Sequence, residues 1–126
     1  MAFIFYNPNP YKQFVGDCAV RAVAKALDRD WENAYIGLCA EGLDLGDMPS
    51  SNYVWGMYLI KNGFQQKMID SICPACTTVA DFAREHKKGT FVVGCEGHVL
   101  TIKDGDYYDS WDSGHKTILF YFRRED

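Results

Sequence analysis

The chain has neither a long apolar run nor a concentration of positive charge. No stretch approaches the ~18 consecutive apolar residues that a membrane-spanning helix requires. Residues 1–6 are apolar but lack a charged start and a small-residue cleavage site, so we expect no secretory signal and a cytoplasmic location. The formal net charge is −4 and the basic residues are scattered, so we expect neither nucleic acid nor a membrane as a partner.

The composition also lacks the marks of a disordered or repetitive chain. Of the 126 residues, 48% are hydrophobic, 15% are aromatic and 24% are charged, which is typical of a globular protein. This length suffices for a core without disulfides or a structural metal. We therefore expect a single domain over residues 1–126.

Five cysteines in a chain without a signal sequence argue against a disulfide framework, and their odd number agrees. In a reducing compartment, a cysteine is a small buried residue, a metal ligand or a nucleophile. Each one must therefore be judged by its neighbours in the sequence.

The hydrophobic pattern predicts helices in the first two thirds of the chain and strands in the last third. One helix begins at Asp17 or Cys18, with Arg21 outside its apolar positions. The other expected helices cover 30–42, 53–62 and 79–86, and the expected strands cover 2–6, 64–68, 90–93, 98–102, 107–108 and 117–122. The resulting fold class is α+β, with an N-terminal helical half packed on a C-terminal antiparallel sheet.

Cys18 stands where a glycine-containing loop meets the start of the first helix, in Gly16-Asp17-Cys18. A thiol at a helix N-terminus lies near free backbone N–H groups and the positive end of the helix dipole. Both favour the thiolate, which is the nucleophilic form of cysteine. Cys39, by contrast, is expected to be a plain core residue of the second helix.

The dipeptide Asp104-Gly105 is the strongest hairpin motif in the chain, and it fixes which side chains face each other. A two-residue turn there makes Asp109 a diagonal cross-strand neighbour of His98, close enough to orient the imidazole. Asp112 falls on the opposite face and is the weaker candidate for that role.

Three short motifs, in this order, resemble the papain-like superfamily of cysteine peptidases (clan CA). They are Gly16-Asp17-Cys18 at a helix start, Gly97-His98-Val99 at a strand start and Asp109-Ser110-Trp111 on the next strand. The resemblance is greatest to the bacteriocin-processing members and the short phage- or plasmid-encoded members. Papain relatives carry Asn in place of Asp109, whereas other members use Asp.

The resemblance implies a papain-like fold, with Cys18 as nucleophile, His98 as general base and acid, and Asp109 as the residue that orients His98. It also implies that a glutamine upstream of the nucleophile donates to the oxyanion, which points to Gln13, with Asn9 or Asn7 as alternatives. The backbone N–H of Cys18 is a second expected donor.

The function expected from this trio is acyl transfer, most simply hydrolysis of a peptide or isopeptide bond in a protein or peptide substrate. Transglutaminase-like and amidase chemistry use the same residues. No cofactor is expected, and the sequence gives no indication of the oligomeric state. The hypothesis from a different class is a non-catalytic binding protein on a papain-like scaffold, as a mobile element could encode.

A zinc-stabilised domain is a third hypothesis. Cys73 and Cys76 are separated by two residues, as are Cys95 and His98, which matches the spacing of a Cys3His zinc site. Zinc would claim His98 for a different task and would leave Cys18 without a partner. We therefore expect no metal.

Overall fold

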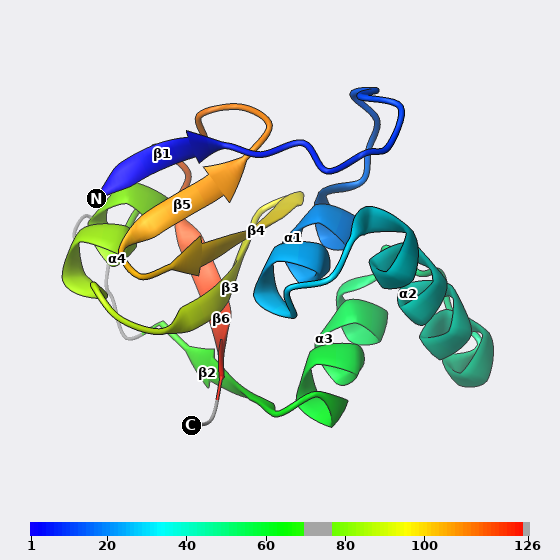
Figure 1. The fold of residues 1–126 in the computed structure, drawn as a ribbon. Helices are drawn as coiled ribbons and strands as arrows, with labels where there is room; N and C mark the ends of the chain where they lie inside the picture. Colours follow the sequence, from blue (N-terminus) through cyan, green and yellow to red (C-terminus); the bar gives the residue numbers. More distant parts are fainter. Residues whose placement is uncertain (70–76, 125–126) are drawn as a thin grey trace.

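The computed structural model describes residues 1–69 and 77–124, which form an α+β fold (Figure 1). Within these ranges no helix has both the length and the apolar character needed to cross a membrane. The helices are α1 (Cys18–Ala26), α2 (Trp31–Leu45), α3 (Asn52–Lys61) and α4 (Val79–Glu85). The strands are β1 (Ala2–Phe5), β2 (Phe64–Met68), β3 (Thr90–Cys95), β4 (His98–Lys103), β5 (Asp106–Asp109) and β6 (Ile118–Arg124).

Side-chain caps fix most helix starts, which is why their positions were predictable. Asp30 caps α2 by accepting a hydrogen bond from the Asn33 N–H, and Thr78 forms a capping box with Asp81 at α4. Helix α2 runs three residues past the expected end at 42, to Leu45. It stops at Gly46, whose φ of 71° is in the left-handed region that glycine adopts without strain.

The strands form one mixed sheet in the order β1-β5-β4-β3-β6-β2. The expectation of a purely antiparallel sheet is wrong at one edge, because β1 pairs with β5 in parallel. The ring centroids of Phe3 on β1 and Tyr107 on β5 lie 5.6 Å apart. Strand β1 occupies the outer edge of β5, so β6 does not pair with β5. Strand β6 pairs instead with β3 and β2.

The β4–β5 hairpin has the predicted register. Lys103 pairs with Asp106, and Thr101 pairs with Tyr108. Asp104 and Gly105 both have positive φ, 50° and 85°, as a tight two-residue turn between twisted strands requires. The turn therefore places the start of β4 beside the end of β5.

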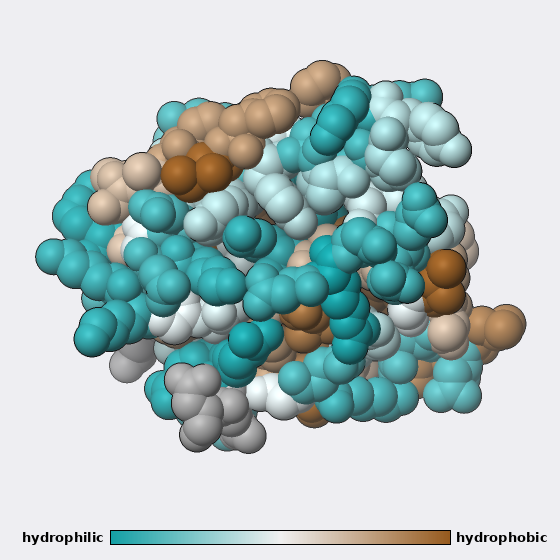
Figure 2. All heavy atoms as spheres, in the orientation of Figure 1, coloured by the Kyte–Doolittle hydropathy of each residue, from teal (hydrophilic) through white to brown (hydrophobic). Residues whose placement is uncertain are grey.

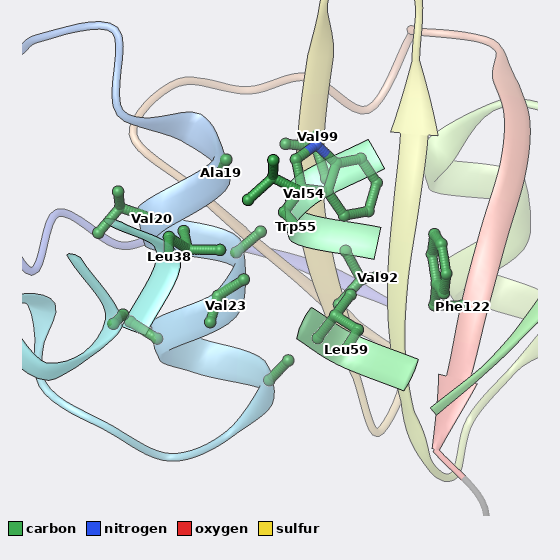
Figure 3. Close-up of a cluster of buried hydrophobic side chains, with 14 of the residues drawn as sticks. Ala19, Val20, Val23, Leu38, Val54, Trp55, Leu59, Val92, Val99 and Phe122 are labelled. Atoms are coloured by element: carbon green, nitrogen blue, oxygen red, sulfur yellow. The ribbon is translucent and has the colours of Figure 1, made fainter. Parts of the chain in front are cut away.

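Buried side chains form two clusters. Figure 3 shows the larger one, in which side chains of α1 and α3 meet those of β3, β4 and β6. The smaller cluster joins α4 to residues of β3, β4, β5 and β6. A hydrogen bond of 2.6 Å from the Thr101 hydroxyl to the Ala22 carbonyl oxygen also fastens α1 to β4. Helix α1 is thus held firmly against the strand that carries His98.

Two details of the helical half differ from the expectation. Tyr35 and Ile36 are apolar residues within the helix expected over 30–42, yet both are exposed on α2. Arg21, expected outside the apolar positions of α1, is buried. Its burial is explained by charged partners described below.

Candidate functional site

The predicted residues meet at one end of the sheet, where β4 begins, β5 ends and α1 has its N-terminus. Figure 1 shows the start of α1 next to the hairpin of β3 and β4. Cys18 is the first residue of α1, His98 the first of β4 and Asp109 the last of β5. Segments far apart in sequence therefore deliver the three side chains to one place.

The Cys18 side chain is half-buried and lines the same cleft as His98, whose imidazole is near enough to lower the pKa of the thiol. The backbone of Val99 lowers that pKa as well. On its outer side, the His98 ring lies against the indole of Trp111, with 4.8 Å between the ring centroids. The thiol and the imidazole thus share one cleft, and an aromatic ring packs against the imidazole.

His98 Nε2 lies 2.6 Å from Asp109 Oδ2. Because Nε2 is directed at the carboxylate, Nδ1 is the ring nitrogen available to Cys18. Asp112 does not take this position, and its carboxylate accepts hydrogen bonds from the Tyr107 hydroxyl and the Gly114 N–H instead. Of the two aspartates considered, the structure brings Asp109 to His98.

The protonation equilibria of the three groups shift together. Burial alone raises the pKa of Cys18, but the hydrogen bond and charge of His98 outweigh burial, so the pKa lies below its ordinary value. Burial alone lowers the pKa of His98, but hydrogen bonds to Asp109 and Cys18 raise it to about 9. Burial also opposes ionisation of Asp109, yet hydrogen bonds from His98 and Ser113 keep its pKa below the usual range. The arrangement favours a thiolate, an imidazolium and a carboxylate.

Asp109 is almost fully buried, and each of its oxygens has two donors. Oδ2 accepts from His98 and, at 2.6 Å, from the Ser113 hydroxyl. Oδ1 accepts from the Ser110 N–H at 2.8 Å and from the Arg21 guanidinium at 3.1 Å. Such a buried carboxylate is held in one orientation, which a histidine partner requires.

Sequence reasoning did not find the residues that support the trio. Arg21 also pairs with Asp17, and Asp17 Oδ2 accepts a hydrogen bond of 2.8 Å from the Trp31 indole N–H. The spacing of four residues between Asp17 and Arg21 was a usable local indication of an ion pair. Ser113 had no comparable indication, because its contact depends on how the loop after β5 folds back.

The N-terminus of α1 has no side-chain cap, since the Asp17 carboxylate is turned toward Arg21 and Trp31. The first-turn N–H groups, beginning with that of Cys18, can therefore donate hydrogen bonds to negative charge that forms at the sulfur. Gln13 lines a hollow that Val15 and Gly16 also border and is not among the residues that line the cleft at Cys18.

Asn9 and Asn7 are used within their own loop. The side-chain oxygen of Asn9 accepts a hydrogen bond of 2.8 Å from the Tyr11 N–H. Asn7 accepts from the Asn9 N–H and donates to the Gln13 carbonyl oxygen, each at 3.3 Å. These contacts shape the loop that precedes the nucleophile.

Cys18 and His98 open into a shallow cleft of about 390 Å³. Phe14, Val15 and Trp111 contribute exposed apolar surface to its walls. A larger and mainly apolar hollow of about 520 Å³ lies beyond Val15 and is bordered by α2. Cys39 lines this hollow and is half-buried, so the expectation of a plain core residue is wrong.

An exposed apolar strip leads toward the cleft. Figure 2 shows brown and tan atoms over β1, against a mostly teal surface elsewhere on that face. Phe5 at the end of β1 is 59% exposed, and its ring lies 6.3 Å from that of Phe14. An apolar or aromatic chain could therefore lie along this strip up to Cys18.

Of the four residues in the zinc hypothesis, Cys73 and Cys76 lie outside the described residues. Cys95 is buried and is the cross-strand partner of His98, and burial raises its pKa to about 11. No group of three or more candidate metal ligands occurs within residues 1–69 and 77–124. His98 itself is engaged by Asp109 and Cys18.

Comparisons of the chain with protein-family models, with curated proteins and with solved structures give no match.

Proposed function

We propose that the protein is an enzyme with a cysteine nucleophile that transfers acyl groups, and that it cleaves peptide or isopeptide bonds on a papain-like fold. The observation that carries the proposal is that Cys18 and His98 line one cleft while His98 is bonded to the buried carboxylate of Asp109. A lone core cysteine needs no such partners. A thiolate beside an imidazolium that is oriented by a carboxylate is the arrangement that nucleophilic catalysis requires.

In the proposed reaction, the Cys18 thiolate attacks the substrate carbonyl carbon and forms a C–S bond. His98 gives its proton to the leaving amine as the C–N bond breaks. Water then attacks the thioester while His98 takes a proton from it, and the thiolate leaves with the C–S electron pair. Asp109 keeps the imidazole oriented in both steps.

Charge that develops on the carbonyl oxygen has a donor in the Cys18 N–H at the uncapped helix start. Loss of one such donor typically costs ~3 kcal/mol of transition-state stabilisation. Gln13, which the resemblance implies for this task, lines the larger hollow rather than the cleft at Cys18. The N-terminus of α1 is therefore the donor that the geometry supports best.

The exposed aromatic residues around the cleft favour a second candidate, a binding protein on the same scaffold. Tyr11, which lines the larger hollow, and Phe14, which lines the cleft, are 81% and 71% exposed, so a partner could contact both. An enzyme acting on proteins would use the same surface. The reactivity of the thiol distinguishes the two candidates.

The test is alkylation with iodoacetamide at about pH 6.5, followed by peptide mapping of all cysteines. We expect Cys18 to react at least about tenfold faster than Cys39 and Cys95, because the pKa of its thiol lies below the ordinary value and it stands at a helix N-terminus. His98→Ala should slow Cys18 strongly. Asp109→Asn should act in the same direction but less, since it misorients the imidazole without removing it.

Equal rates at Cys18 and Cys39, or a Cys18 rate that His98→Ala leaves unchanged, would leave the binding protein as the better candidate. Far-UV circular dichroism of each variant checks that its fold is retained.

A further inference from the structure

Arg21 is a buried cation one helical turn after Cys18, and only 6% of its surface is exposed. An arginine is almost never buried this deeply without charged partners, because removing its charge from water is costly. Its partners in the described structure are the carboxylates of Asp17 and Asp109. One belongs to the residue before the nucleophile and the other to the residue that holds His98.

The planar guanidinium makes these two contacts with different nitrogens. Nη1 contacts Asp17 Oδ1, and Nη2 contacts Asp109 Oδ1 at 3.1 Å. The side chain thereby links the start of α1 to the end of β5, across 88 positions of the sequence. A lysine has a single nitrogen and could not present this fork to two carboxylates.

The contact also determines which oxygen of Asp109 faces His98. Arg21 and the Ser110 N–H occupy Oδ1, so Oδ2 is left to His98 and Ser113. Rotation of the carboxylate would break several of these bonds at once. Arg21 therefore restrains the group that in turn restrains the imidazole.

We propose that Arg21 is a positioning residue of the Cys18–His98–Asp109 site, which it holds together by bridging Asp17 and Asp109 and whose thiolate it stabilises by its charge. This inference rests on the proposed function. It adds a residue that none of the motifs pointed to.

The charge of Arg21 acts in the direction that the proposal requires. It lowers the pKa of Cys18, in addition to the larger effect of His98. The other groups facing Arg21 from packed segments include Tyr6, whose pKa burial raises to about 12, so it stays neutral near pH 7.

On the far side of Asp109, Cys95 of β3 stays neutral as well, with a pKa raised by burial to about 11, and Lys116 lies near it. The charges that lower the pKa of Cys18 are thus those of His98 and Arg21.

A purely structural ion pair predicts something different. Removing it would lower the stability of the protein, but Cys18 in the molecules that remain folded would titrate as before. A positioning residue predicts a change in the titration and in turnover within the folded protein.

The test measures Cys18 alkylation as a function of pH, together with hydrolysis of p-nitrophenyl acetate. In the double variant Asp17→Asn/Arg21→Gln, one carboxylate and one cation are removed together, so no buried charge is added to the fold. Because the two removed charges act on Cys18 with opposite signs, the change acts mainly through the loosened Asp109 and His98. We expect the alkylation rate at pH 6 to fall about threefold, with a matching rise in the midpoint of Cys18 ionisation.

Arg21→Lys retains the cation but lacks the planar fork that reaches the two carboxylates from separate nitrogens. We expect its ionisation midpoint to stay near that of the wild type while ester turnover falls about tenfold. Arg84→Gln is the matched control, because Arg84 forms an exposed ion pair with Asp81 on α4, outside the site. It should change neither measurement.

A folded double variant with the wild-type midpoint and rate would overturn the inference. So would full ester turnover in Arg21→Lys, which decides the matter if the double variant does not fold. A wild-type Cys18 that reacts no faster than Cys39 would instead overturn the proposed function, and this inference with it.

Discussion

At the scale of single residues, His98 is the group that interacts with both the Cys18 thiol and the Asp109 carboxylate. One ring nitrogen is directed at Asp109, and the imidazole also bonds to Cys18. The raised pKa of about 9 means that the imidazolium is favoured in the folded chain. Protonation of His98 therefore stabilises the fold as well as preparing the proton for the leaving group.

This coupling predicts how stability depends on pH. A histidine whose pKa rises from 6.5 to about 9 on folding contributes stability that is complete below pH 6.5 and is lost as the pH rises through 9. To keep Cys18 from titrating, the comparison uses Cys18→Ser with and without His98→Gln. We expect Cys18→Ser to be the more stable of the two proteins at pH 6. Its advantage in unfolding free energy over Cys18→Ser/His98→Gln should fall by on the order of 1 kcal/mol between pH 6 and pH 10.

Urea unfolding at several pH values measures this difference. Groups other than His98 titrate alike in both proteins and cancel. A difference that is constant with pH, or that grows, would mean that His98 is not protonated preferentially in the fold.

At the scale of elements, the β4–β5 hairpin determines whether His98 and Asp109 meet. Its turn demands left-handed backbone at both residues, with φ of 50° at Asp104 and 85° at Gly105. Asparagine tolerates this region, whereas a β-branched side chain does not. The Asp104 carboxylate also accepts a hydrogen bond from the Gly89 N–H at 3.0 Å, which asparagine could still accept.

We therefore expect Gly105→Val to lower the unfolding free energy by about 1–2 kcal/mol. A Cβ at position 105 would also approach the Lys87 Cα at 3.4 Å. Asp104→Asn, the matched control, should stay within about 0.5 kcal/mol of the wild type. Urea denaturation of the three proteins is the measurement, and equal stability of the two variants would mean that the turn does not constrain the hairpin.

At the scale of the whole molecule, local rules predicted the elements that depend on local chemistry. Asp30 and Thr78 marked helix starts because a cap needs only a side-chain oxygen and nearby N–H groups. Asp104 and Gly105 gave the hairpin register, and parity then placed Asp109 rather than Asp112 with His98.

The features that were not predicted depend on contacts between distant segments. No turn in the sequence predicts the parallel pairing of β1 with β5, because most of the chain lies between these two strands. The burial of Arg21 follows from Asp109, which is remote in sequence. The place of Gln13 depends on the path of the loop before α1, which no periodicity encodes.

The most direct test of the central claim is turnover of p-nitrophenyl acetate in excess over the protein, with the acetyl group mapped by mass spectrometry. We predict more than one equivalent of p-nitrophenol per chain and a transient acetyl thioester on Cys18. Cys18→Ser should release none above background, and His98→Ala should acetylate slowly and fail to turn over. Acetylation spread equally over Cys18 and Cys39, or turnover that survives Cys18→Ser, would contradict an acyl-transfer site built on Cys18, His98 and Asp109.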